Sequence, residues 1–416
     1  MGLFGKHKAG DNYGAIIDIG SGSVLAAIVL SKSDHKHPQI IWSKREYLPL
    51  RPEGNTETSA KRVMTSFLNV LLELETNGLK ALHEHKSGAR VTNTQVTVCA
   101  PWSYTVTKSI TYKHKEPFVI SPELIAELVR TAHKKVNEEL NENEKTHNMG
   151  LTVINREQIA NIANGYRFTH TNRQQAKELR VVEASAVAQE YLVKQVKDTK
   201  DKVLPRSELQ MYSFMLAYYS VLRSLDSSFR EYCLIDITYE ATEIGIVRDG
   251  ILEYCTHTPI GSYTLARDIA SACDHPVTEV FSALQNNELD LWLEQLNEKQ
   301  RALVASVFDN YRTSLTELFK ETGDGLSIPK RMYLHSNLKS EQLLDDYISE
   351  AARIATNSSH AVYSATERLL QLLYPETVKN EINNSTNDTA LLISAQFFHI
   401  KMQSLKFADD GAAILY

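Results

Sequence analysis

Runs of hydrophobic residues separated by turn residues predict strands at the start of the chain. These runs occupy residues 13–19, 24–30 and 39–47, and a glycine- and serine-rich segment at residues 20–23 separates the first two. β-Branched runs bounded by turn residues are typical of strands. Hydrophobic residues at i, i+3, i+4 and i+7 spacing then predict a helix over residues 60–74. Its apolar face consists of Ala60, Val63, Met64, Phe67, Leu68, Leu71 and Leu72.

The middle of the chain has the pattern of a separate module. We predict strands at residues 95–100 and 104–112, followed by a helix that begins at Ser121-Pro122-Glu123. Serine at the N-cap, proline at the first helical position and an acidic first turn are typical of a helix start. We also predict a helix over residues 184–196. The lysine- and aspartate-rich residues 197–207 indicate a linker.

The opening pattern returns after residue 231. Strands are predicted at residues 232–238, 242–247 and 251–257, and Asp249-Gly250 fits a hairpin turn because this pair readily takes positive φ. Helical spacing dominates residues 265–319. A short buried strand is predicted at residues 331–335, a helix at residues 340–356, and a polar loop at residues 381–389.

An aspartate recurs at the same place in both patterns. Ile17-Asp18-Ile19 matches Ile235-Asp236-Ile237, and at the same separation Ile28-Val29 matches Ile246-Val247. Burying an unpaired carboxylate costs several kcal/mol, so each buried aspartate needs a compensating partner. A single strand–aspartate–turn segment is commonly structural. Two copies favour a duplicated α/β fold whose aspartates face each other across a cleft, where they hold a hydrated Mg²⁺ while the turn N–H groups cradle phosphates.

Composition narrows the class of protein. The chain has 416 residues, more than one hydrophobic core usually supports, and its 43% hydrophobic and 23% charged residues are ordinary for a folded protein. A net charge of −6 argues against a nucleic-acid partner. The four cysteines lack metal-ligand spacing, and no run of roughly 18 apolar residues or signal peptide occurs. We therefore expect a cytoplasmic protein without direct membrane insertion.

The segment Gly14-Ala-Ile-Ile-Asp-Ile-Gly-Ser-Gly-Ser-Val24 resembles the first phosphate loop of the superfamily of actin, heat-shock chaperones and sugar kinases. Within that superfamily the chain is similar to bacterial FtsA and PilM. Residues 232–261 resemble the second phosphate region, and residues 261–270 resemble the helix that follows it in FtsA. Asn164-Gly165-Tyr166 resembles a part of the subdomain that FtsA and PilM insert in their first half.

The resemblance implies an α/β fold: a duplicated actin-like (RNase H-like) ATPase fold with an inserted α+β subdomain in the first half. Residues 1–93 would form the first half with phosphate loop 1, and residues 94–200 the inserted subdomain. Residues 201–230 would be the return helix of the first half. Residues 231–416 would be the second half, with a helical insertion at about residues 271–326.

The resemblance also implies a site for ATP with Mg²⁺. The residues that would bind the cofactor are Asp18, Gly20, Ser21, Gly22, Ser23, Asp236, Thr238, Thr242, Gly261, His335 and Ser336. Asp18 and Asp236 would hold the metal.

Three departures from the family pattern weaken this site. Leu25 stands where many relatives carry lysine, and the second loop reads Thr238-Tyr239-Glu240-Ala241-Thr242 instead of a glycine- and threonine-rich sequence. An inward Glu240 would repel a phosphate by roughly 4 kcal/mol per unit charge at ~4 Å. The Gly-Gly turn that seats adenosine would fall at residues 334–337, which lack glycine. Two hypotheses stay open: ATP binds without efficient turnover, or the cleft survives only as a scaffold.

We expect an assembly protein of an inner-membrane machine, most like PilM of the type IV pilus platform, peripheral to the membrane through a partner. Its partner would be the cytoplasmic tail of a membrane protein or a division-ring protein, and self-association or a filament stays open. FtsA-like proteins carry an amphipathic C-terminal helix, whereas residues 404–416 are too short and acidic for one. The alternatives are an FtsA-like division protein, favoured by Asp268-Ile269-Ala270, and a small-molecule kinase, which would need intact phosphate loops.

Overall fold

The computed structural model describes residues 11–49, 56–142, 150–169, 174–225, 230–322, 328–336, 338, 341–373 and 388–409. The predictions for residues 143–148, 337, 340, 381–387 and 410–416 therefore lie outside the described residues.

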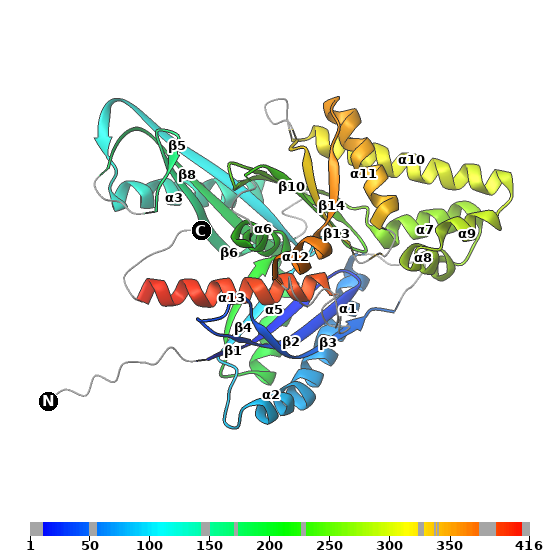
Figure 1. The fold of residues 1–416 in the computed structure, drawn as a ribbon, viewed down its shortest axis with the longest axis horizontal. Coiled ribbons are helices and arrows are strands. Elements are labelled where there is room, and N and C mark those ends of the chain that lie inside the picture. Colours follow the sequence, from blue (N-terminus) through cyan, green and yellow to red (C-terminus); the bar gives the residue numbers. More distant parts are fainter. Residues whose placement is uncertain are drawn as a thin grey trace.

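Two five-stranded sheets with the same plan form the centre of the molecule (Figure 1). The first has the order β3-β2-β1-β4-β9 and the second the order β12-β11-β10-β13-β14. In each sheet the first three strands along the chain are antiparallel neighbours, and the last two run parallel to the first strand. The strands of the first sheet are β1 (Asn12–Ile19), β2 (Ser23–Ser31), β3 (Gln39–Tyr47), β4 (Asn93–Val98) and β9 (Glu208–Ser213). Those of the second are β10 (Tyr232–Ile237), β11 (Thr242–Arg248), β12 (Ile251–Thr258), β13 (Arg331–Ser336) and β14 (Ala361–Ser364).

The repeat extends to an irregularity of the backbone. The pairing of β2 with β3 shifts register between Ile28 and Val29, and the pairing of β11 with β12 shifts between Ile246 and Val247. These are the residues that match in the sequence repeat. Such a shift marks a β-bulge or a similar irregularity, and it falls at the same point of both sheets. The duplicated α/β fold predicted from the sequence is confirmed.

Helices cover both faces of the first sheet, which explains why β1 and β2 are almost continuously apolar. On one face, Ile17 and Val24 pack with α1 (Thr56–Glu73) and α5 (Glu190–Val203) in one core cluster. On the other, Ile16 and Val29 pack with α13 (Thr389–Asp409). The buried face of α1 differs in part from the prediction. Leu68 and Leu72 are 44% and 46% exposed, because the buried stripe runs through Phe67 and Leu71, as predicted, and then through Val70, which was not predicted.

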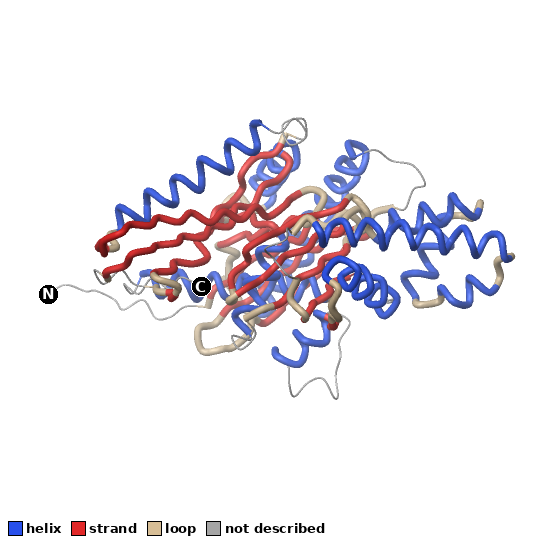
Figure 2. The backbone as a smooth tube through the Cα atoms, turned by 90° about the horizontal axis from the view of Figure 1, so that it is seen from above, coloured by secondary structure: helices blue, strands red, loops and turns tan. Residues whose placement is uncertain are grey.

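A four-stranded antiparallel sheet with the order β5-β8-β6-β7 projects from the first half (Figure 2). Its strands are β5 (Ser103–Val119), β6 (Leu151–Ala163), β7 (Tyr166–Arg167) and β8 (Gln175–Gln189). Helix α3 (Pro122–Glu142) packs against it, and the Ser121 hydroxyl accepts a bond from the Leu124 amide at 3.2 Å, as expected of an N-cap. Asn164 and Gly165 make the β6–β7 turn with positive φ.

Two predictions for the end of this module are wrong. Residues 184–189 belong to β8, and the helix, α5, begins only at Glu190. β8 pairs with β5 on one side and β6 on the other, so strand pairing outweighs the helix preference of its alanines. The predicted linker is also ordered. Residues 197–203 continue α5, buried Lys200 donates to the Ser207 carbonyl, and unpredicted strand β9 follows.

The second half carries the predicted helical region on one side of its sheet. Helices α7 (Ser262–Cys273), α8 (Val277–Asn286), α9 (Leu289–Glu294), α10 (Glu298–Lys320) and α11 (Glu341–Thr356) share one core cluster with β10, β11 and β13. Asn297 and Gln300 form a reciprocal capping box at the start of α10.

Helices α6 (Phe214–Leu225), α12 (Ala365–Leu373) and α13 lie between the two halves (Figure 1). α13 was not predicted as a helix, and it is apolar on two faces. Phe398 packs against β1 and β2, whereas Phe397 packs against α6 and the second sheet. Gly14 of β1 meets the Phe398 ring so closely that a Cβ there would lie 2.2 Å from it. None of the described helices is long and apolar enough to cross a bilayer.

Leu71→Ala and Leu72→Ala test the corrected face of α1. Leu71 is fully buried, so its truncation should lower the free energy of unfolding by about 2–5 kcal/mol. Leu72, next to it on the same helix, should cost less than about 1 kcal/mol. Urea denaturation followed by circular dichroism measures both. Equal losses for the two variants would contradict the packing described above.

Candidate functional site

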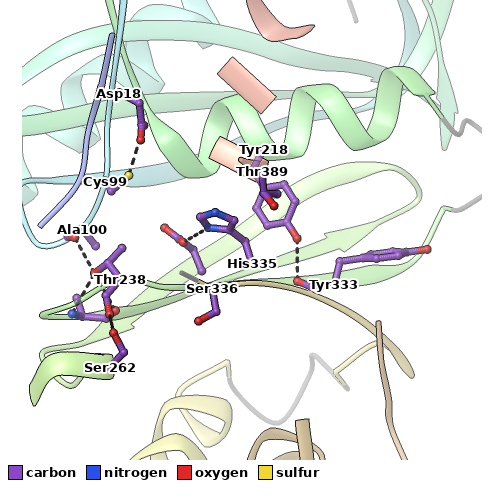
Figure 3. A network of polar contacts seen from close by, with 12 residues as sticks. Asp18, Cys99, Ala100, Tyr218, Thr238, Ser262, Tyr333, His335, Ser336 and Thr389 are labelled. Carbon is purple, nitrogen blue, oxygen red and sulfur yellow. Dashed lines mark hydrogen bonds and ion pairs between the residues drawn. The ribbon is translucent and has the colours of Figure 1, made fainter. Parts of the chain in front are cut away.

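The two repeated aspartates lie near the ends of equivalent strands, and both are close enough to Cys99 to act on its pKa. Asp18 lies near the end of β1 and Asp236 near the end of β10, and both are buried. His335 of β13 places its Nδ1 2.7 Å from Asp236 Oδ1 (Figure 3). Asp18 accepts hydrogen bonds from the Thr97 hydroxyl at 3.0 Å and from the Cys99 thiol at 3.7 Å. Both aspartates raise the pKa of Cys99, after burial itself, so the thiol lies between the two halves of the repeat.

Burial and charge act on these groups in opposite directions. Burial raises the pKa of Asp18 to about 6, although the Arg45 guanidinium and the Thr97 hydrogen bond oppose the shift. For His335, burial lowers the pKa, but the hydrogen bond and attraction to Asp236 prevail and the pKa is raised. The pair therefore stabilises the fold fully below the ordinary histidine pKa, and this contribution is lost as the pH rises through the raised value.

The two turns that follow the aspartate strands touch each other. The Ser21 hydroxyl accepts a hydrogen bond from the Glu240 amide at 3.1 Å. A Cβ on Gly22 would lie 2.0 Å from the Tyr239 ring, so only glycine fits beneath that ring. Tyr239 is buried and packs edge-on against Phe281 of α8, which holds it in place. The protein's own side chains thus fill the space between the turns.

The other predicted residues support this arrangement. Gly20 closes the first turn by donating to the Ser23 carbonyl at 3.0 Å, and the Thr238 hydroxyl contacts the Ala100 and Ala241 carbonyls at 3.0 Å each. A Cβ on Gly261 would lie 2.4 Å from the Thr238 carbonyl oxygen, so this close approach requires glycine.

Thr242 and Ser336 direct their hydroxyls to local backbone. The Thr242 hydroxyl donates to the Ile260 carbonyl at 2.7 Å, and the Ser336 hydroxyl accepts from the Leu338 amide at 3.1 Å.

A buried cation that the sequence did not reveal lies beside the first turn. Arg45 of β3 donates to both carboxylate oxygens of Asp388 at 2.7 Å each and to the Ser23 hydroxyl at 2.6 Å. Asp388 caps α13 by accepting from the Leu391 amide at 3.0 Å. Although burial raises the pKa of Asp388, attraction to Arg45 prevails and lowers it. An Asp-Thr pair before an apolar run is a helix-start signal that could have revealed Asp388. No local signal marks Arg45.

Two glutamates of the second turn and the strand after it, Glu240 and Glu243, also differ from what the sequence indicated. Glu240 does not stand as an uncompensated charge, because its Oε2 lies 2.8 Å from Arg267 Nη2 of α7. This ion pair removes the basis for the predicted repulsion. Glu243 is a buried acid that sequence reasoning missed. Burial and the neighbouring Asp236 raise its pKa well above its usual range, and it accepts from the Thr105 amide at 3.4 Å.

ATP with Mg²⁺ would need ligands for the metal and space for the phosphates between the two turns. Asp236 Oδ2 is buried without a hydrogen-bond partner among the described residues, so it could accept from a metal-bound water. In the same part of the chain, however, no group of three or more His, Cys, Asp or Glu side chains is placed to hold a metal ion. Tyr239 and the Ser21–Glu240 bond close the gap between the two turns, which is where the resemblance implies that phosphates would lie. In this arrangement the residues do not fit a bound nucleotide.

Asp18→Asn should make stability less dependent on pH. Because the folded-state pKa of about 6 exceeds the ordinary value of about 4, the folded protein loses stability as pH rises between them. Asparagine removes the ionisation and keeps the shape. The free energy of unfolding of the variant should rise relative to that of the natural protein between pH 4 and 6. Above pH 7 it should remain about 3 kcal/mol higher. Urea denaturation at pH 4.5 and pH 8 measures this, and a constant difference at both would contradict the raised pKa.

Comparison with known proteins shows the fold. No family model matches the sequence, and no curated protein matches it. The structure is similar to the PilM–PilN type IV pilus biogenesis complex, with a TM-score of 0.55 at 13% identity over 94% of this chain and 99% of that one. The ethanolamine utilization protein EutJ from Carboxydothermus hydrogenoformans gives 0.42 at 10% identity, over 93% and 89% of the chains. A Bacteroides thetaiotaomicron protein of unknown function with the actin-like ATPase fold gives 0.39 at 8% identity, over 85% and 90%. The chain has the actin-like ATPase fold.

Proposed function

We propose that this protein is a scaffold in the assembly of an inner-membrane machine, most like PilM of the type IV pilus platform. It lies on the cytoplasmic side, binds the tail of a membrane partner, and does not turn over ATP. The proposal is carried by the contact between the two turns, where the Tyr239 ring covers Gly22 and Ser21 binds the Glu240 amide. An enzyme of this fold needs that space for the transferred phosphate.

Contacts between the inserted sheet and the second half support a rigid role. The Thr107 hydroxyl of β5 donates to the Glu253 carbonyl of β12 at 2.7 Å, and Arg180 of β8 pairs with the Glu253 carboxylate at 3.1 Å. The Tyr104 and His257 rings stack at 3.8 Å between their centroids. These bonds join the inserted sheet to the second half, and they would have to break if the halves separated at that edge.

The partner follows from the similarity of fold and from a groove. The PilM structure with this fold is a complex with PilN, which favours a membrane-protein tail as the ligand. In this chain a cavity of about 600 Å³ lies between β6, α5 and β9, where the inserted sheet meets the first half. Asn155 lines it, and its side-chain oxygen is buried without a partner among the described residues. That oxygen can accept a backbone N–H of an extended peptide.

An FtsA-like role in division remains the second candidate. Asp268-Ile269-Ala270, the stretch that resembles FtsA, lies within α7, directly behind the second turn. The kinase alternative is not proposed, because the phosphate space is filled.

Calorimetry with ATP and Mg²⁺ tests the scaffold assignment on the natural protein, Tyr239→Ala and Asp18→Ala. We expect no saturable heat and no phosphate release from the natural protein, because Tyr239 fills the phosphate space. Tyr239→Ala removes the ring, so any gain in affinity for ATP should appear in this variant. Tight binding by the natural protein that disappears in Asp18→Ala would replace the scaffold with a nucleotide-dependent protein.

Peptide binding tests the groove independently. A labelled peptide from the cytoplasmic tail of a PilN-type protein should bind saturably in fluorescence anisotropy. Asn155→Leu removes the unpaired acceptor and should weaken binding by roughly fivefold to tenfold, the equivalent of one hydrogen bond. Asn286→Leu, at an exposed position on α8, is the control and should bind normally. Equal affinity of all three proteins would remove the groove from the proposal.

A further inference from the structure

A second cavity, of about 310 Å³, lies where α6, β6 and α13 meet. It also adjoins β6, but it shares no lining residue with the groove proposed for the partner. One part of its wall is apolar and another carries cations and hydroxyls. The residues that matter are Ile159, Tyr219, Arg223, Phe397, Ile400 and Lys401. Its volume is at the lower end of the range for small-molecule sites.

The positive charges at this cavity are only partly balanced. Lys401 forms an ion pair with Glu157. Among the described residues, by contrast, Arg223 donates only to neutral oxygens, the Ile159 carbonyl at 3.3 Å and the Tyr219 hydroxyl at 2.8 Å. It has no carboxylate partner among the described residues. A half-buried guanidinium is most stable when an anion accepts its parallel N–H groups.

A second arginine and a tyrosine behind Arg223 are also incompletely satisfied. Arg167 donates to the Gly250 carbonyl at 2.9 Å, but within the described part of the chain its buried Nε has no acceptor. Burial lowers the pKa of Arg167, and repulsion from Arg223 lowers it further, so the two cations are close. The Tyr232 hydroxyl is buried and likewise lacks a partner among these residues.

Both arginines also affect the pKa of Tyr232. Burial raises its pKa, whereas the charges of Arg223 and Arg167 act to lower it. Two neighbouring cations and an unpaired hydroxyl therefore share one partly buried region. A negative charge at Arg223 would relieve the repulsion between the arginines.

We propose that this cavity binds a small amphipathic anion, with its carboxylate or phosphate group on Arg223 and its apolar chain along Ile159, Phe397 and Ile400. The apolar side chains exclude water from the chain, and the guanidinium gives a reason to prefer an anion to a neutral molecule of the same length. Because α6 and α13 both lie between the halves, the ligand would contact both helices and stabilise their packing against each other. This site does not depend on the proposed partner or on ATP.

Titration calorimetry with sodium octanoate and octan-1-ol tests the site on the full chain. Octanoate should bind saturably, and octan-1-ol at least tenfold more weakly, because it lacks the charge that Arg223 recognises. Arg223→Gln should weaken octanoate at least tenfold. Arg230→Gln is the matched control: Arg230 is exposed, lies outside the cavity and should not change the affinity.

Additional arms identify the source of the ligand. Octyl phosphate should bind like octanoate, inorganic phosphate should bind weakly because it lacks the apolar chain, and phosphatidylglycerol vesicles should not sediment the protein. The proposal is overturned by equal binding of octanoate and octan-1-ol, by no saturable binding of either amphipathic anion, or by binding to vesicles alone. It is also overturned if folded Arg223→Gln, checked by circular dichroism, binds normally. The octanoate and octan-1-ol comparison decides the matter even if that variant does not fold.

Discussion

Two buried carboxylates, one at the end of β1 and one at the end of β10, constrain the centre of this molecule. A buried charge must be compensated, and the protein compensates these two to different degrees. Asp236 has a cationic partner in His335, at 2.7 Å. Asp18 has weaker partners, Thr97 and Cys99, and burial raises its pKa to about 6, so it is still ionised above pH 7 but at a greater cost than an exposed aspartate. The residues around the cleft follow from these two requirements.

The same constraint explains why the halves are held together. Arg45 contributes positive charge near Asp18, and its own partner is Asp388 at the start of α13. The charge balance of the first turn therefore depends on a helix that lies more than 300 residues later in the chain. α13 then packs on β1 with one face and on α6 with the other, so the electrostatic contact and the apolar contacts fix the same helix.

The space between the two turns is closed by the protein's own side chains. Tyr239 replaces what would be open space above Gly22, and the Glu240 carboxylate pairs with Arg267. These contacts stabilise one arrangement of the two halves. Both cavities described above lie beside β6 and away from this contact.

The sequence by itself determined the duplication, the strands around both aspartates and the helical region of the second half, because these depend on local periodicity and turn residues. It could not predict structure that depends on distant residues, such as the strand at residues 184–189. There, pairing with a strand on each side outweighs the helix preference of alanine. Only the tertiary structure revealed Arg45, Asp388 and the Tyr239 ring on Gly22. Each of these depends on a contact between residues far apart in the chain, which no local pattern records.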